Sequence, residues 1–460
     1  MSKKTLRVLA VFVPLALLTV ACTEDEEPTD ATGTTEASGA GDGSTDPTTA
    51  PAEEVEIDYE AIGLWDDGPC DAALEPLVIG LMTVFESPVI SLGDQALALE
   101  AAAEAFNQRG GANGACLEVH TCDDGADPGR SVECVREIVD AGVMVTVNDQ
   151  GTQGQAEVNA AMLDAGIPRV GALISPDDWA APNMYTLDAG GTGVAFILPQ
   201  ALIDAGATSL GSIRVDFASA SALNGLLAGI YEGDATFDFD APVSTGTTDY
   251  SQYILAAEDA EADGAVLALG ENEAIQVVRA GQQLDTAVLM GASLGSFTHS
   301  QIAELGDFAD RMVFAGSYPP ATADVPVYAA LRDDLAASGE DALQPANLKA
   351  SPMRSWIGLY ALLHVLRDTG MTEFTSAAIT QALDQAVDVP MLGMFGGEDW
   401  TPALEHEGLL TRSGLDSWAS YRWDPAAEAP DGLEGNFVQT SEIDFSAVLC
   451  GSPLGAPEPC

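Results

Sequence analysis

Short apolar runs rich in Val, Ile and Leu alternate with longer amphipathic stretches through the middle of this 460-residue chain. Most of the amphipathic stretches end at a Gly, and the next apolar run begins almost at once. A Gly suits the position just after a helix because it adopts the left-handed backbone conformation freely. Short apolar runs favour buried strands and the longer stretches favour helices. The alternation therefore predicts βαβ units and parallel sheets.

The pattern occurs in two sets of similar size. In the first set, Asp127 is suited to cap a helix and Pro128 to occupy its first position. Asp238 and Asp240, in the second set, lack the spacing of a calcium loop and predict a solvated strand or turn. We therefore predict an α/β fold with two doubly wound parallel-sheet lobes. The expected strands are 76–82, 117–121, 143–148, 167–174, 209–215, 265–270, 286–292 and 312–317, and the expected helices are 95–111, 127–142, 155–166, 193–206, 220–233, 249–264, 271–281, 325–338, 352–369 and 375–386.

The N-terminal residues have the pattern of an export signal. A short basic start precedes an apolar core at 8–20, which is shorter than the roughly 20 residues of a membrane span. Cys22 directly follows the small residue Ala21, as in bacterial lipoprotein signals, so we expect Cys22 to be lipidated after cleavage of residues 1–21. The alternative is a plain signal peptide with a chance cysteine. We expect residues 22–75 to form an acidic, disordered linker, because the first part of this segment has few apolar side chains that a fold could bury.

The charge balance restricts the partners of the chain. It has 72 acidic residues against 16 Lys plus Arg, a formal net charge of −56. Proteins bind phosphate backbones and anionic lipid headgroups through basic patches, so we expect this chain to bind neither nucleic acid nor lipid headgroups directly. Such a surface keeps an exported protein soluble or suits a salty habitat, and the sequence leaves both open.

Six cysteines follow Cys22, and an even number in an exported chain favours three disulfides over a zinc site. No pair has CxxC spacing and the four histidines are scattered, which argues further against zinc. Fifteen connectivities are possible. The positions of the cysteines relative to the expected strands and helices favour Cys122–Cys134, Cys70–Cys116 and Cys450–Cys460.

Small polar loops follow the expected strands in both sets. In open parallel sheets, ligands bind beyond the carboxyl ends of the strands, and the N–H groups of a following helix suit a carboxylate. GASLG (291–295) also matches the G-x-S-x-G elbow of hydrolases, with Ser293 as the nucleophile of an alternative function. No nucleotide-binding motif is present, and we expect no cofactor and no metal. The candidate ligand-binding residues are Phe85, Gln150, Gly151, Thr152, Ala172, Ile174, Ser175, Phe217, Glu271 and Ser293.

Four segments resemble the type I periplasmic binding proteins of ABC importers, in the branched-chain amino acid binding family. They are SPVISLGDQ (87–95), CDDGADPGRSVECVREIVDAGVMVTV (122–147), DYSQYILAAEDAEADGAVLALG (249–270) and SPMRSWIGLYALLHVLRDTG (351–370). The resemblance covers roughly 76–399. It implies two lobes joined by three hinge crossings, near 188–192, 315–320 and 390–397. The expected boundaries are 76–190 with 317–393 for the first lobe, 191–316 with 394–445 for the second, and 446–460 for a C-terminal tail.

The resemblance implies that a ligand carboxylate binds the loops at 149–152 and 172–175. Gly191, Thr192 and Ser293 lie near the positions where the family holds an ammonium with acids, so Glu271, Asp188 or Asp216 would have to substitute. We therefore expect an extracytoplasmic solute-binding lipoprotein that is not an enzyme. It would bind an amino acid or related carboxylate as a monomer and deliver it to ABC permease subunits. A ligand-sensing receptor domain of the same fold is the alternative.

Overall fold

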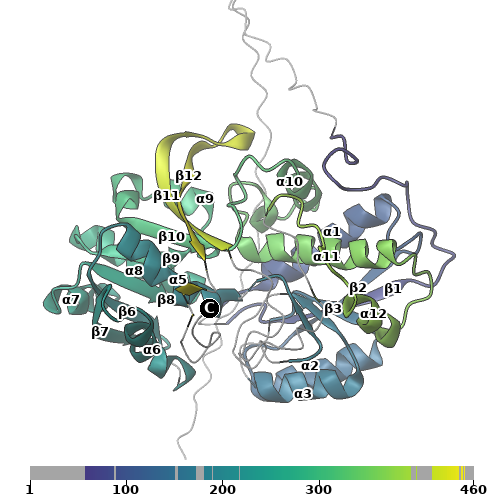
Figure 1. The fold of residues 1–460 in the computed structure, drawn as a ribbon, viewed down its shortest axis with the longest axis horizontal. Coiled ribbons are helices and arrows are strands. Elements are labelled where there is room, and N and C mark those ends of the chain that lie inside the picture. The colour runs from purple at the N-terminus through teal and green to yellow at the C-terminus, as the bar shows by residue number, and fades with distance from the viewer. Residues whose placement is uncertain are drawn as a thin grey trace, which may run out of the picture. The chain divides into compact units, whose positions relative to one another are not determined.

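The computed structural model describes residues 57–450 except 88–89, 151–153, 172–180, 189, 217, 395–399, 401–416, 445–446 and 449. Its first sheet contains five parallel strands in the order β2-β1-β3-β4-β5. Figure 1 labels β1, β2 and β3 of this sheet. Nearly every residue of β1 is buried, as expected for a strand covered by helices on both faces. The strands are β1 (Leu77–Thr83), β2 (Leu117–Asp123), β3 (Val145–Val147), β4 (Arg169–Gly171) and β5 (Met184–Thr186).

Helices cover both faces of this sheet. On one face, α1 and α11 pack together over a large apolar core that includes Phe106 and Trp356. On the other face, α2 and α3 enclose a smaller core around Met82 and Ile138. We call this sheet and its helices the first lobe. The helices are α1 (Gly93–Gln108), α2 (Pro128–Asp140), α3 (Gln155–Ala165), α10 (Tyr328–Ala336), α11 (Ala350–Asp368) and α12 (Ser376–Leu383).

The second sheet has seven strands in the order β12-β11-β10-β9-β8-β6-β7. Five of these strands are parallel, and they repeat the strand order of the first sheet. We call this sheet and its helices the second lobe. Its parallel strands are β6 (Ser209–Val215), β7 (Thr236–Val243), β8 (Gly264–Ala268), β9 (Leu289–Ser293) and β10 (Met312–Gly316); its helices are α5 (Gly190–Asp204), α6 (Leu223–Ile230), α7 (Ser251–Asp259), α8 (Glu271–Leu284) and α9 (His299–Ala303).

A long hairpin of β11 (Ser417–Glu428) and β12 (Glu434–Asp444) completes the second sheet. It joins β10 in the antiparallel direction, and the sequence pattern did not predict it. The reason is a register shift between Ser420 and Tyr421, which breaks the alternation of buried and exposed side chains. Trp418 and Ser420 are buried before the shift, whereas Tyr421 and Trp423 are buried after it.

The predicted linker was too long at its C-terminal end. Leu64 is buried in the first-lobe core, and the ring of Trp65 stacks on Tyr360 with centroids 5.7 Å apart. Cys70 forms a disulfide with Cys116. Residues 57–75 therefore belong to the folded part, because this stretch has the apolar and aromatic side chains that the preceding acidic tail lacks.

Two of the three expected disulfides are present. Cys70 pairs with Cys116, and Cys122 pairs with Cys134. Cys450 is also disulfide-bonded, but Cys460 lies outside the described residues, so that pairing stays a prediction.

None of the helices in the described part of the chain combines the length and the apolar character needed to cross a membrane.

Candidate functional site

The strand order of the first sheet places its topological switch point between β1 and β3. The connections from these two adjacent strands lead to opposite faces of the sheet, which is where open α/β sheets bind ligands. Thr83 at the end of β1 forms an isolated bridge with Gln150, and the Gln150 amide donates to the Met82 carbonyl at 2.9 Å. Two predicted site residues, Phe85 and Gln150, thus follow neighbouring strands at this position.

A buried polar network fixes this edge of the first lobe. The Thr83 hydroxyl donates to Gln95 Oε1 at 3.0 Å, and Gln95 Nε2 donates to the Ser351 hydroxyl at 2.6 Å. Asn148 Nδ2 donates to the Ser351 carbonyl and to the Ser355 hydroxyl. Because these residues come from β1, α1, α11 and the loop after β3, the network holds the starts of two helices against the ends of two strands.

Gly171 allows β4 to approach the same network closely. Its φ is +155°, and an ideal Cβ there would lie 2.5 Å from Asn148 Cα. Asn148 itself has a positive φ of 54° and a fully buried side chain. Larger residues at position 171 would therefore displace the backbone of the loop that carries Gln150.

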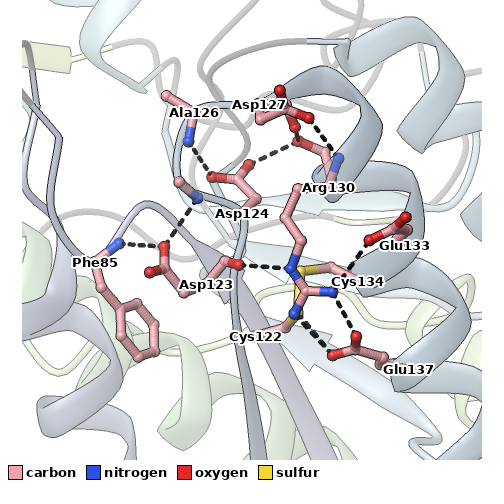
Figure 2. The surroundings of a disulfide bond; sticks show 12 residues. Phe85, Cys122, Asp123, Asp124, Ala126, Asp127, Arg130, Glu133, Cys134 and Glu137 are labelled. Atoms are coloured by element: carbon pink, nitrogen blue, oxygen red, sulfur yellow. Dashed lines mark hydrogen bonds and ion pairs between the residues drawn. A yellow bond between two sulfur atoms is a disulfide. The ribbon is translucent and has the colours of Figure 1, made fainter. Parts of the chain in front are cut away.

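Phe85 is held through its backbone by the β2–α2 turn. Figure 2 shows the Asp123 carboxylate beside the Phe85 amide, which donates to Oδ1 at 3.0 Å. The same oxygen accepts from the Gly125 amide at 2.9 Å. The Cys122–Cys134 disulfide joins the end of β2 to α2 directly beneath this turn. The disulfide therefore stabilises the segment that positions the Phe85 backbone.

The second lobe presents Glu271 and Ser293 at the carboxyl ends of two adjacent strands. Glu271 is the first residue of α8, just after β8, and Ser293 ends β9. The Ser293 hydroxyl accepts from the Gly295 amide at 3.3 Å and caps a short 3₁₀ helix, Leu294–Ser296. Among the described residues, no histidine is hydrogen-bonded to Ser293; His299 Nε2 instead pairs with the Gly435 carbonyl.

The two glycines of the GASLG motif have packing roles. An ideal Cβ at Gly291 would lie 2.9 Å from Leu202 Cδ1, so this Gly lets α5 pack closely on β9. An ideal Cβ at Gly295 would lie 2.4 Å from Ala350 Cβ, at the start of α11 in the first lobe. The motif therefore marks a close helix–strand contact and a close contact between the lobes. These two contacts explain why both positions are Gly, and neither explanation requires Ser293 to be catalytic.

Lys349 connects the two lobes beside this contact. It precedes α11, and its ammonium forms ion pairs with Glu271 of the second lobe and with Asp94 of α1, the latter at 3.1 Å. The Lys349 side chain is 19% exposed and that of Asp94 is 8% exposed. The three groups thus form a largely buried charged cluster, which we call the Lys349 cluster.

The electrostatics of the Lys349 cluster favour the lysine in its charged form. Burial alone would lower the pKa of Lys349, but the carboxylates of Glu271 and Asp94 raise it above its ordinary value. Burial raises the pKa of Glu271 to about 7, the Lys349 ammonium opposing that rise and the Asp94 carboxylate adding to it. Near neutral pH the cluster therefore holds a charged Lys349 beside a Glu271 carboxyl group that is close to its pKa.

A second buried ion pair lies at the crossings between the lobes. Asp188 follows β5 and is fully buried, and its Oδ2 accepts from Arg354 Nη2 at 2.5 Å and from Nε at 3.1 Å. The Ser317 hydroxyl, just after β10, donates to the same oxygen. The Arg354 guanidinium also lies over the Tyr318 ring, 5.4 Å from its centroid. Two crossings and α11 therefore meet at one carboxylate.

The structure locates four of the ten predicted ligand-binding residues. Phe85 and Gln150 lie at the edge of the first sheet, and Glu271 and Ser293 at the edge of the second. The other six, and Cys22, lie outside the described residues: Gly151, Thr152, Ala172, Ile174, Ser175 and Phe217.

Sequence reasoning missed Lys349 and Asp94. One signal was available, because the chain has no lysine other than Lys349 after residue 4. A single lysine among so many acidic residues indicated a specific ion-pair partner. Its position in a loop before a helix did not identify the residue with which it pairs.

The fold and the matched regions agree with one family. A family model described as "Periplasmic binding protein" matches residues 76–409. A search of curated proteins finds no match.

Three similar solved structures cover most of the chain. A fatty acid ABC transporter substrate-binding protein from Thermomonospora curvata is 16% identical, with a TM-score of 0.66 over 83% of this chain and 95% of that one. A solute-binding protein of an ABC transporter from Rhodopseudomonas palustris in complex with p-hydroxybenzoic acid is 14% identical, with a TM-score of 0.64 over 81% and 98%. A leucine-, isoleucine-, valine-, threonine- and alanine-binding protein from Brucella ovis is 15% identical, with a TM-score of 0.60 over 84% and 98%. Together with the match over 76–409, the two doubly wound sheets identify this chain as a member of the periplasmic binding protein family.

Proposed function

We propose that this protein is the solute-binding component of an ABC importer and that it takes up one small organic molecule between its two lobes. The observation that carries the proposal is the Lys349 cluster. Its ion pairs connect residues that follow strands of the first and the second sheet, on the side where such sheets bind ligands. A ligand that contacts both edges would bind the arrangement in which the lobes meet more tightly than one in which they are apart. Closure of the lobes follows from that difference in affinity.

The ligand class is a small organic molecule with a carboxylate or similar polar head. The proposed head site is the first-lobe edge, where the loops at 150–152 and 172–175 follow β3 and β4. Phe85 and Phe217 would cover the apolar part of the ligand. The names of the three similar structures mention a fatty acid, p-hydroxybenzoic acid, or leucine, isoleucine, valine, threonine and alanine, and all of these compounds carry a carboxylate.

Two further properties belong to the proposal. The mature chain would be anchored to the cell membrane through a lipid on Cys22 and would deliver its ligand to the permease subunits of the importer. Replacing Cys22 with Ala should then move the protein from the membrane fraction to the soluble fraction. Mass spectrometry that finds an unmodified N-terminus at another residue in the wild-type protein would refute the anchor.

Ligand screening followed by calorimetry tests the site. Thermal shift with a library of organic acids and amino acids identifies a ligand, and titration then compares the wild type with Thr152→Ala, Ser175→Ala and Glu271→Gln. Loss of a hydrogen bond from Thr152 or Ser175 to the ligand carboxylate should weaken binding about ten- to a hundred-fold, whereas Glu271→Gln should weaken binding only of a ligand that bears a positive group. Unchanged affinity in all three variants would place the ligand elsewhere. Arg279→Met, at an exposed position on α8, is the control and should bind like the wild type.

A further inference from the structure

The three acidic residues that the sequence offered for a ligand ammonium, Glu271, Asp188 and Asp216, already have cations or donors of the protein itself. Glu271 pairs with Lys349, and Lys349 also pairs with Asp94. Asp188 is fully buried against Arg354. Asp216, the remaining candidate from the sequence, is exposed and accepts from the Ser244 hydroxyl at 3.1 Å. The two largely buried acids among these three candidates are therefore occupied by Lys349 and Arg354.

Lys349 is an unusual side chain to find in this position. The chain has 72 acidic residues and no other lysine after residue 4, yet this one lies between two carboxylates where the lobes meet. A lysine that served only solubility or surface ion pairing would be exposed, and such pairs contribute little. The Lys349 ammonium is instead largely buried, and a buried charge needs its partners.

An amine-bearing ligand would have to compete with Lys349. To reach the Glu271 carboxylate, its ammonium would displace the lysine and leave that buried charge short of one partner, which is strongly unfavourable. A ligand without an amine makes no such demand. It leaves the Lys349 cluster intact, and its carboxylate does not compete with Lys349 for Glu271.

We propose that Lys349 is a specificity-determining residue that occupies the place of a ligand ammonium, and that the ligand is an organic acid without an amino group. This inference rests on the proposed solute-binding function and narrows its ligand class. Leucine-type and phenylalanine-type amino acids are excluded, whereas their deaminated counterparts of the same shape are accepted. The protein discriminates between an amino acid and its deaminated counterpart through the Lys349 ammonium, and not through the shape of the apolar part of the ligand.

The test uses pairs of ligands that differ only in the amino group: 4-methylpentanoate against leucine, and 3-phenylpropanoate against phenylalanine. Binding of each compound is measured by calorimetry with the wild type, Lys349→Met and Lys349→Arg. Arg279→Met is the matched control, because it removes one positive charge from an exposed position on α8, whose first residue is Glu271. The melting temperature without ligand shows that each variant is folded.

In the wild type, we expect a deaminated compound to bind at least ten-fold more tightly than its amino acid. Lys349→Met should remove or reverse that preference, since Glu271 and Asp94 are then free to receive an ammonium. Lys349→Arg and Arg279→Met should keep it. Tighter binding of the amino acids by the wild type, or an unchanged preference in Lys349→Met, would overturn the inference and leave the solute-binding function intact. Failure of every organic acid and amino acid to bind, with no small molecule released on denaturing the native protein, would remove the proposed function as well.

Discussion

Replacing Gly295 with Ala should separate the two lobes. Gly295 lies in the second lobe, and an ideal Cβ there would be 2.4 Å from the Cβ of Ala350 in the first lobe. Non-bonded carbon atoms prefer about 3.5–4.0 Å, so the two segments must move apart by roughly 1 Å or more. Ala350 directly follows Lys349, and this movement therefore withdraws the lysine from Glu271.

The magnitude follows from the cost of overpacking. Inserting a methyl group where there is no room costs about 1–3 kcal/mol when neighbours must shift. That free energy disfavours the arrangement in which the lobes touch by roughly five- to a hundred-fold. The Lys349–Glu271 pair should weaken to the same extent, because hydrogen bonds fail beyond about 3.5 Å.

Acylation of Lys349 measures this change without a known ligand. Only this lysine follows residue 4, so a peptide map after brief treatment with an amine-reactive reagent reports on Lys349 alone. Loss of Glu271 as a partner also lowers the pKa of Lys349, which raises the fraction of reactive free amine. We expect at least a five-fold faster reaction in Gly295→Ala than in the wild type at the same pH.

The control is Gly225→Ala on α6, where an ideal Cβ meets no atom within 4 Å. It makes the same chemical change in the same lobe and should react like the wild type. Equal acylation rates in Gly295→Ala, Gly225→Ala and the wild type would show that the close approach of Gly295 to Ala350 does not hold the lobes together.

Three further predictions concern stability. Burial raises the pKa of Glu273, which is 4% exposed, to about 7, so the folded state binds more protons than the unfolded state and stability falls as the pH rises from about 4.5 to 7. In urea unfolding at pH 8, the free energy of unfolding of Glu273→Gln should exceed that of the wild type by up to about 3 kcal/mol. No gain in this variant would contradict the raised pKa. Asp188→Asn should lose about 3–5 kcal/mol because it leaves the buried Arg354 charge without its partner; the Asp188→Asn, Arg354→Met double variant should recover part of this loss, and strictly additive losses would show that the two side chains do not interact. Removing the Cys122–Cys134 disulfide, which closes a short loop of sequence separation 12, should lower the free energy of unfolding by about 3 kcal/mol; a loss below about 1 kcal/mol would show that the turn needs no covalent bond.

Local sequence signals were sufficient for most of the helices and parallel strands. Asp127 accepts from the Arg130 amide and Pro128 begins α2, as the sequence predicted. Gly166 ends α3 in the left-handed conformation. These features depend only on neighbouring residues, which is why they can be read from the sequence. The β11–β12 hairpin was missed because its register shift moves the buried side chains from one alternation to the other.

The site could be predicted only in part. Glu271 was identified because it begins a helix after a buried strand, which is a local pattern. Its partner Lys349 comes 78 residues later in the sequence and from the other lobe. The separation between Asp188 and Arg354 is 166 residues. Partners of this kind are set by the packing of α11 against both lobes, and no periodicity or motif along the chain encodes them.

The most direct test of solute binding is native mass spectrometry of the purified protein, before and after mixing with the low-molecular-mass fraction of a bacterial culture. We predict a single added mass that corresponds to one small organic molecule per chain, released on denaturation and retained much more weakly by Gly295→Ala than by Gly225→Ala. A folded wild-type chain that retains no small molecule, or that retains it equally in both glycine variants, would contradict binding between the lobes.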